Sequence, residues 1–325
     1  KIFKKEGEIK DKNLIKTINK VNLISGENFI NLRVCDIYSK NCFKSNISKE
    51  DFIKVSRGNY QMNEKKYFYF NNNKNASENK KELNYKNYKI NDFINIRAYG
   101  NPQILIKKEE REIEIKFKSN ADKIIFHDSN ISEWKIYATA DKNLLREEKT
   151  SRIDSNLITG SLVIRDSMLE NISLFFENGI NEDSINIIRS IGSIKEIFVK
   201  NSFQDAIDLD FSDLNIQKIK VEEAGNDCLD LSSGNYQINE LIAFKCYDKG
   251  ISVGESSSTE IKNLFVNKSS IAIVVKDSSR AKILNVEVID SDKCLALYRK
   301  KEEFSGSYLL IPKKVCKENI FVQKN

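Results

Sequence analysis

The sequence contains an internal repeat of 22 residues, and this period constrains the fold more than any other feature. Five short segments begin at positions 206, 228, 250, 272 and 294, each 22 residues after the last. Their second positions are all aliphatic: Ile207, Leu229, Ile251, Ile273 and Leu295. Their fourth positions are aliphatic too: Leu209, Leu231, Val253, Val275 and Leu297. This alternation is typical of a strand that buries one face.

A second strand follows at nearly the same period. Its two aliphatic columns are Ile194, Ile216, Ile238, Ile261, Ile283 and Ile197, Ile219, Leu241, Leu264, Val286. A strand-rich period of this length, with polar turns and little helical signal, predicts an all-β fold: a parallel β-solenoid with one coil per 22-residue period. A leucine-rich repeat has a similar period, but its LxxLxLxxN signature is absent. Equal positions should stack about 4.8 Å apart on neighbouring coils.

The regular repeat does not span the whole chain, so we expect three regions. Residues 101–304 are predicted to form the parallel β-helix, with an earlier and less regular coil within 101–128. Residues 1–100 are irregular and are interpreted as an N-terminal cap or accessory region, and residues 305–325 as a C-terminal cap. Caps are expected because an open coil exposes both its core and its strand edges.

Composition and charge exclude several classes of function. The 325 residues carry 53 Lys+Arg and 47 Asp+Glu, mixed along the chain, which does not give the segregated basic face of a nucleic-acid binder. No apolar run approaches the roughly 18 residues of a membrane helix. A single histidine, His127, argues against a multi-His metal site and against a Ser-His-Asp enzyme. We expect no nucleic-acid partner and no membrane span.

The six cysteines include no CxxC motif, so a zinc or thioredoxin-type site is not indicated. Cys35 and Cys42 bracket a short loop and are candidates for pairing. Cys294 and Cys316 are 22 residues apart, so stacking would bring them together and pin the C-terminal cap. The chain begins with Lys1 rather than Met, which fits either a removed secretion signal or a trimmed chain. We expect a secreted, periplasmic or cell-surface protein; buried free thiols are the alternative.

The outward positions of the repeating strand carry the candidate site. One outward column is Asn186, Asp208, Asp230, Ser252 and Val274, and the next is Ile188, Asp210, Ser232, Gly254 and Lys276. Strand rise and spacing place Asp208, Asp210 and Asp230 within about 5–8 Å of one another. Three carboxylates at this separation need a cation, a nearby Lys or Arg, or a raised pKa.

Two kinds of chemistry fit this face. Two carboxylates about 6.5–9.5 Å apart suit an inverting glycoside hydrolase. Alternatively, Ca²⁺ held by Asp208, Asp210 and Asp230 neutralises a uronic acid while a Lys or Arg removes a proton, as in a lyase or epimerase. The candidate catalytic residues are Asp208, Asp210, Asp230, Lys249, Glu255, Lys276 and Asp277. The candidate substrate-binding residues are Asn186, Asp227, Arg299 and Lys300. Turn and surface roles compete with function at Asp205, Asp213 and Asp227.

The same segments resemble a known group of proteins. DAIDLDFSD, GNDCLDLSSG, YDKGISVGESS, IAIVVKDSS and ALYRKKEEF, in this order, resemble secreted right-handed parallel β-helix proteins of the pectin-lyase-like superfamily. They are most similar to the β-helix module beside spore-coat-H-kinase-like and lamin-tail-like domains. The resemblance covers about residues 155–310, and it departs from the pattern at Cys228 and Arg299. It implies an exported β-helix with carbohydrate as ligand, without a defined reaction.

Together these observations predict a right-handed parallel β-helix with 22-residue coils and an N-terminal cap region. The functional hypothesis is an exported protein that binds and modifies an anionic polysaccharide along a charged face, with Ca²⁺ as the candidate cofactor. The alternative is a non-catalytic cell-surface, scaffold or carbohydrate-binding module. Lyase, hydrolase and epimerase activities stay open at this point.

Overall fold

The computed structural model describes residues 85–145, 158–312, 315–316 and 319–323, together with three strands nearer the N-terminus. The chain divides into two units, residues 1–79 and residues 80–325. Within the described residues the one helical element is a short 3₁₀ turn, η1 (Lys142–Leu145), and no helix there could cross a membrane. The predicted all-β class is confirmed.

The first unit contains a small antiparallel sheet. Its strands are β1 (Ile18–Leu23), β2 (Phe29–Cys35) and β3 (Cys42–Ser48), paired in this order. Cys35 and Cys42 lie directly opposite each other in the β2–β3 register. The backbone therefore makes these two cysteines cross-strand neighbours, and a disulfide between them stays a prediction.

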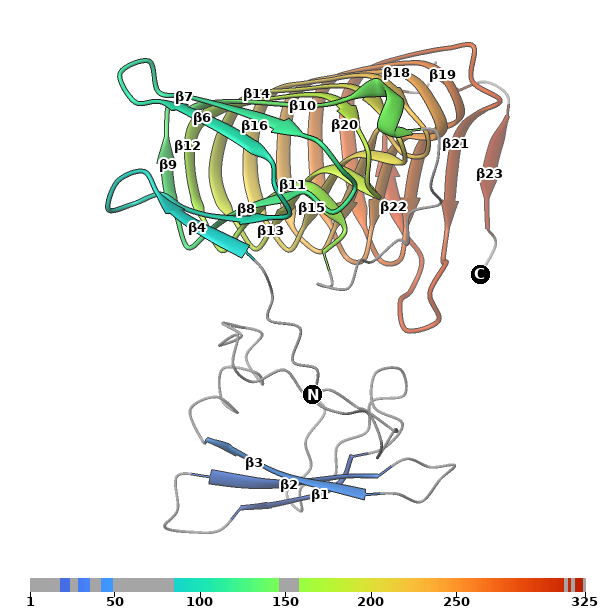
Figure 1. The fold of residues 1–325 in the computed structure, drawn as a ribbon. Coiled ribbons are helices and arrows are strands. Elements are labelled where there is room, and N and C mark those ends of the chain that lie inside the picture. Colours follow the sequence, from blue (N-terminus) through green and yellow to red (C-terminus); the bar gives the residue numbers. More distant parts are fainter. Residues whose placement is uncertain are drawn as a thin grey trace. The chain divides into compact units, whose positions relative to one another are not determined.

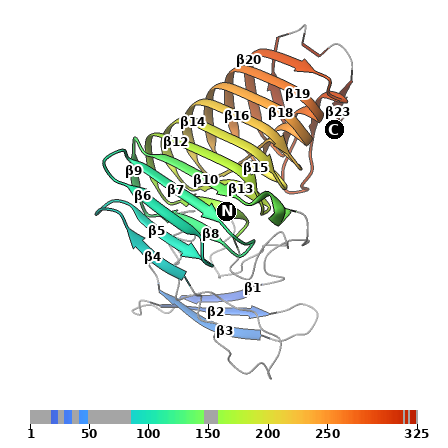
Figure 2. The ribbon, with the colours of Figure 1, turned by 45° about the horizontal axis from the view of Figure 1, so that its top comes forward.

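The second unit is the predicted parallel β-solenoid, with about nine turns (Figures 1 and 2). We call its three strand ladders faces A, B and C. Face A consists of β8 (Lys123–His127), β11 (Gly160–Arg165), β13 (Asp183–Ile188), β15 (Asp205–Asp210), β17 (Leu229–Ser232), the C-terminal parts of β18 (Asn235–Gly254) and β19 (Ser258–Lys276), β21 (Lys293–Tyr298) and β23 (Ile320–Val322).

Faces B and C are formed by the remaining segments of each coil. Face B consists of β9 (Asn130–Ser132), the N-terminal parts of β12 (Met168–Gly179), β14 (Ile191–Ser202), β16 (Asp213–Ala224), β18, β19 and β20 (Arg280–Ile289), and β22 (Tyr308–Leu310). Face C consists of β7 (Glu112–Phe117), β10 (Lys135–Ala140) and the C-terminal parts of β12, β14, β16 and β20, with the middle of β18 and β19.

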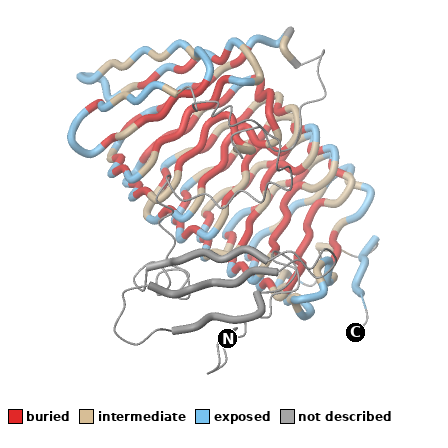
Figure 3. Tube along the Cα trace, turned by 60° about the horizontal axis from the view of Figure 1, so that its bottom comes forward, coloured by how far each residue is buried: buried red, intermediate tan, exposed pale blue. Residues whose placement is uncertain are grey.

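The strand registers follow the repeat. Ile207 pairs with Leu229, and Leu229 with Ile251, so aliphatic residues of equal position stack on adjacent coils. These side chains are fully buried and belong to one continuous core, and Figure 3 shows buried stretches recurring from coil to coil. Burial of these columns is the main favourable contribution to the stability of such a fold.

Antiparallel strands occupy the N-terminal end of the solenoid. β4 (Tyr85–Lys89) pairs with β5 (Asn95–Tyr99), and β5 pairs with β8 of the first coil. β6 (Gln103–Lys107) pairs with β7 in the same antiparallel manner. Because an uncovered first coil would expose unpaired backbone groups, β5 protects the edge of face A and β6 that of face C (Figure 2).

Two disulfides lie in the described part of the solenoid. Cys294 and Cys316 are bonded, as predicted, with their Cα atoms 5.7 Å apart. They are not stacked equivalents, however, because the register of the last coil pairs Leu295 with Ile320 and so places Asn319, not Cys316, beside Cys294. A second disulfide joins Cys228 and Cys246, which the sequence did not predict. These two residues are 18 apart, which is not a multiple of the 22-residue period, so the bond closes one coil rather than linking stacked positions. Two disulfides in the described residues indicate an oxidising compartment.

A serine ladder closes the corner after face A. The backbone N–H of Ser167 donates to the Oγ of Ser190, and that of Ser190 to the Oγ of Ser212. At the next coil the equivalent position is Gly234. There the hydroxyl of Tyr236 donates to the carbonyls of Ser232 and Leu209, 3.0 and 2.8 Å away, the kind of bonds that a serine makes at the other coils.

Candidate functional site

The predicted outward column is present on face A. Asn186 pairs in register with Asp208, and Asp208 with Asp230. Asp210 follows on the same strand as Asp208, on the same side of the sheet. The three aspartates singled out from the sequence are therefore neighbours on two adjacent coils.

Exposure divides the aspartates of this face into two sets. Asp208, Asp210 and Asp230 are partly exposed, and we call them the open aspartates. Asp183, Asp205 and Asp227 lie where the strands begin and are buried. Only the open aspartates can meet a large ligand directly.

Two of the buried aspartates accept hydrogen bonds from backbone N–H groups of the next coil. Asp205 accepts a hydrogen bond of 2.7 Å from the backbone N–H of Asp227, one coil further on. Asp227 in turn accepts one of 3.1 Å from the backbone N–H of Lys249. These bonds support a structural role in the turns for Asp205 and Asp227, because a carboxylate that accepts a hydrogen bond from the next coil stabilises the stacking of the two coils. Asp213 makes a similar contact, accepting from the backbone and side chain of Asn235.

Five of these aspartates have raised pKa values. Burial raises the pKa of Asp183 and of Asp227 to about 7. It raises the pKa of Asp205 and of Asp210 to about 6. The pKa of Asp208 is also raised well above its ordinary value, first by burial and then by the charge of Asp210. A carboxyl of this kind keeps its proton into the pH range where an ordinary aspartate is ionised.

Asp208 and Asp210 differ in their hydrogen bonds. The side-chain amide of Asn186 donates to Asp210 Oδ2 at 3.1 Å, and this bond favours the ionised form of Asp210. The Asp208 carboxylate receives no hydrogen bond from any residue in the described part of the chain. Within this pair the proton therefore belongs on Asp208.

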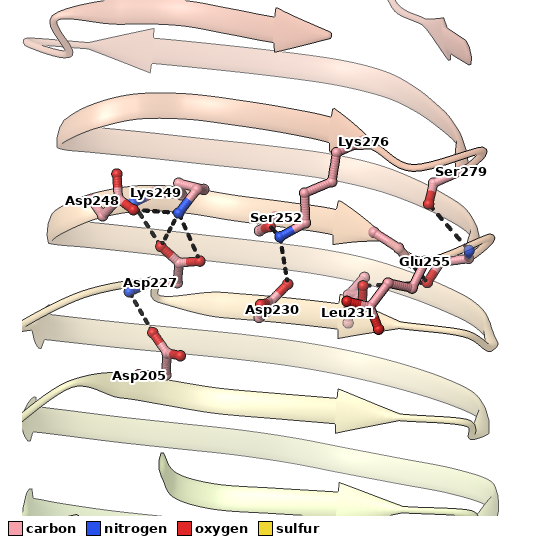
Figure 4. A network of polar contacts seen from close by, with 12 residues as sticks. Asp205, Asp227, Asp230, Leu231, Asp248, Lys249, Ser252, Glu255, Lys276 and Ser279 are labelled. Carbon is pink, nitrogen blue, oxygen red and sulfur yellow. Dashed lines mark hydrogen bonds and ion pairs between the residues drawn. The ribbon is translucent and has the colours of Figure 1, made fainter. Parts of the chain in front are cut away.

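Asp230 has a cationic neighbour that reaches across two coils (Figure 4). Lys276 Nζ lies 3.8 Å from Asp230 Oδ1 and donates to Ser252 Oγ at 2.9 Å. A Cβ on Gly254 would lie 2.6 Å from Lys276 Cε, so the glycine leaves room for the lysine stem. Lys276 is thus a buried counter-ion that substrate does not reach directly.

Lys249 also forms ion pairs with carboxylates. Its Nζ donates to both oxygens of Asp227, at 3.0 and 3.2 Å, and to Asp248 (Figure 4). Although burial alone would lower its pKa, these carboxylates raise it. Lys249 therefore holds its proton, whereas a catalytic base needs a lowered pKa.

The remaining candidates lie at the far end of face A. Asp277 is buried, and its Oδ1 accepts the backbone N–H groups of Lys300 and Lys301 at 2.6 and 2.9 Å. Glu255 pairs with the Lys301 ammonium. Arg299 is exposed, and its backbone N–H donates to Gln323. Glu255 and Asp277 thus bind the segment after β21, and the charge of Glu255 also contributes to the raised pKa of Asp210.

The residues do not fit a metal centre. Among the residues that the structure describes, no three His, Cys, Asp or Glu side chains converge as ligands of one ion. Asp208, Asp210 and Asp230 face the same side without forming a shared oxygen cage. We therefore derive no step through Ca²⁺.

Two features of the site were not foreseen. Asp183 joins the aspartate set, although it was not chosen as a candidate; its position, 22 residues before Asp205, was the available signal. Lys276 and Asp230 are 46 residues apart in the sequence. The only sequence signal for their contact is Gly254, which has no side chain to block the lysine.

Comparisons with protein-family models, with curated proteins and with solved structures find no match. The chain is therefore a parallel β-solenoid without a family assignment. Its similarity to pectin-lyase-like β-helix modules stays a resemblance of sequence motifs.

Proposed function

We propose that this protein binds a polysaccharide along face A and hydrolyses it by general acid–base catalysis. One observation supports this most directly: two partly exposed aspartates with raised pKa values, Asp208 and Asp210, lie together on one face of the β-solenoid. An open carboxyl that is still protonated near neutral pH is what a general acid requires. The fold is compatible with carbohydrate-active enzymes, which by itself is an analogy.

Asp208 acts as the acid in this proposal and Asp210 as the base. Asp208 donates its proton to the glycosidic oxygen as the bond from that oxygen to the anomeric carbon breaks. Asp210, whose ionised form Asn186 favours, takes a proton from the water that attacks the anomeric carbon. Residues two apart on a strand are separated by about 6.5–7 Å, near the lower limit for inversion of configuration. Solvent then returns the proton from Asp210 to Asp208.

Hydrolysis is preferred over lyase or epimerase chemistry because the lysines are poorly suited as bases. Lys249 is bound to Asp227 and Asp248 and has a raised pKa. Lys276 is buried between Ser252 and Asp230, where it supplies positive charge beside the open aspartates. We assign both lysines to electrostatic support rather than to proton abstraction.

A neutral polysaccharide fits face A better than the anionic polymer expected from the sequence. Uronic acids would meet the open aspartates at neutral pH, where Asp210 is ionised. An anionic polymer should bind only at acidic pH, once these carboxyls are protonated. The two disulfides favour a secreted, periplasmic or cell-surface setting for this activity.

A depolymerisation screen tests the proposal. The full chain is incubated at pH 5–7 with neutral and uronic-acid polysaccharides, each with Ca²⁺ and with a chelator, and product size and new unsaturation are recorded. We expect shortened chains without unsaturation, and loss of this activity in Asp208→Asn and Asp210→Asn. Asp290→Asn is the matched control, because Asp290 is exposed and asparagine accepts its positive φ of 51°.

Other outcomes would reject hydrolysis. Unsaturated products would identify a lyase and require a different base. Saturable binding without turnover on any polymer would favour the non-catalytic carbohydrate-binding module. Activity that persists in Asp208→Asn would remove Asp208 from the mechanism.

A further inference from the structure

A cleft lies at the N-terminal end of the solenoid, built from residues that the aspartate site does not use. Its volume is about 390 Å³, within the range of small-molecule sites. The β4–β5 turn, the β6–β7 turn, β9 and the start of β12 line it, and both turns lie at this end in Figure 1. We call it the end cleft, and its main lining residues are Phe93, Lys108, Arg111, Asn130, Trp134 and Glu170.

An exposed aromatic ring stands at the rim of the end cleft. The Phe93 side chain is 63% exposed, which is costly for a phenylalanine in water. Its backbone is nevertheless fixed: the N–H groups of Phe93 and Ile94 donate to Asn91 Oδ1 at 2.9 Å. The Phe93 carbonyl also accepts the backbone N–H of Asn130 at 2.8 Å. A solvent-facing ring on a backbone that is held in place is a suitable stacking platform.

A second aromatic residue lies deeper. Trp134 lines the same cleft and is only 6% exposed, so its indole packs largely in the core. The sequence favoured core packing for Trp134, and the cleft leaves part of its surface open. Phe93 and Trp134 together offer apolar surface at two depths, which suits a ligand with an apolar ring face.

The polar groups of the cleft carry mixed charge. Glu170 accepts a hydrogen bond of 2.8 Å from Ser132 Oγ, and Arg111 pairs with Glu133. The charged lining residues are Lys108, Arg111 and Glu170, and the Arg111 charge is already paired with Glu133, which leaves little net charge for a ligand rich in phosphate. A purely apolar ligand would leave the charged groups of the cleft unpaired. Hydroxyl groups can donate to Glu170 and accept from Lys108 or Asn130. This combination of aromatic surface and mixed polar groups matches a neutral sugar ring.

We propose that the end cleft is a second carbohydrate site, which binds a neutral sugar residue with its apolar face towards Phe93 and Trp134. The site uses none of the aspartates of face A, so it stands whether or not face A hydrolyses a glycan. In a protein that acts on polysaccharide, it would hold part of the polymer away from the open aspartates.

The single tryptophan makes the test direct. Trp134 is the only tryptophan of the chain, so its emission reports on the end cleft. The full chain is titrated with neutral oligosaccharides (cello-, manno-, xylo- and malto-series), with oligogalacturonate and with ATP. We expect a saturable change in emission with at least one neutral series. Phe93→Ala and Glu170→Gln should weaken that binding about 3- to 10-fold.

Two controls separate this site from face A. Phe211→Ala removes another exposed ring, 58% exposed, which lies three coils further along the same corner and outside the cleft lining, and it should leave the Kd unchanged. Asp208→Asn should also leave it unchanged, even if hydrolysis is lost. The proposal is overturned if no neutral oligosaccharide alters the emission, if ATP binds more tightly than every sugar, or if Phe93→Ala and Glu170→Gln bind as well as the parent chain.

Discussion

The aspartates of face A should make the protein less stable as the pH rises from about 4 to about 7. Asp183, Asp205, Asp210 and Asp227 have folded-state pKa values of about 6 to about 7, and that of Asp208 is also raised. In the unfolded chain each would titrate near 3.9. Between these values the folded protein binds more protons than the unfolded chain, so the free energy of unfolding falls as protons are removed.

The size of this effect follows from proton counting. Each extra proton held by the folded state changes the free energy of unfolding by about 1.4 kcal/mol per pH unit. Between pH 4.5 and 6.5 we expect the folded protein to hold at least one proton more than the unfolded chain. The free energy of unfolding should therefore fall by about 3 kcal/mol over that interval. Among the described residues, His127 and Glu222 act in the opposite direction, because burial lowers the pKa of His127 and the hydrogen bond with Lys220 lowers that of Glu222. They are two groups against five. Lys249 keeps its proton throughout this range.

Urea unfolding with the disulfides intact measures the slope. Midpoints and m values are recorded from pH 4.5 to 7.5 for the parent chain, for Asp208→Asn and for the control Asp290→Asn. Asp208→Asn should be more stable than the parent chain at pH 7.5 and should show a shallower slope, because one titrating carboxyl is gone. A free energy of unfolding that is flat or rises over this interval would refute the inferred burial and charge repulsion on face A.

Two further perturbations test individual contacts. Lys276→Met leaves Asp230 without its buried counter-ion and should cost about 2–4 kcal/mol at pH 7.5 but less at pH 5, as urea midpoints would show; equal losses at both pH values would contradict an ionic role. Tyr236→Phe deprives the carbonyls of Leu209 and Ser232 of their buried donor and should cost about 1–3 kcal/mol in thermal or urea unfolding. An unchanged midpoint would mean that these carbonyls find another partner.

The sequence by itself determined the architecture, because the same pattern of aliphatic and polar residues recurs every 22 residues and so specifies the same strands and turns in every coil. Alternating aliphatic residues fix which side of each strand is buried, and equal spacing fixes which residues stack. The period therefore places Asp208 beside Asp230 on neighbouring coils. Residues whose neighbours follow the period are predictable in this way.

The tertiary structure decided what the side chains do. Asp205 and Asp208 are three residues apart, yet one accepts a backbone N–H from the next coil and the other receives no hydrogen bond from a described residue. Lys276 reaches Asp230 over Gly254, two coils away. The period fixes backbone positions, but burial and pKa depend on which side chains converge in space, and a contact such as that of Lys276 with Asp230, 46 residues apart, does not follow the repeat.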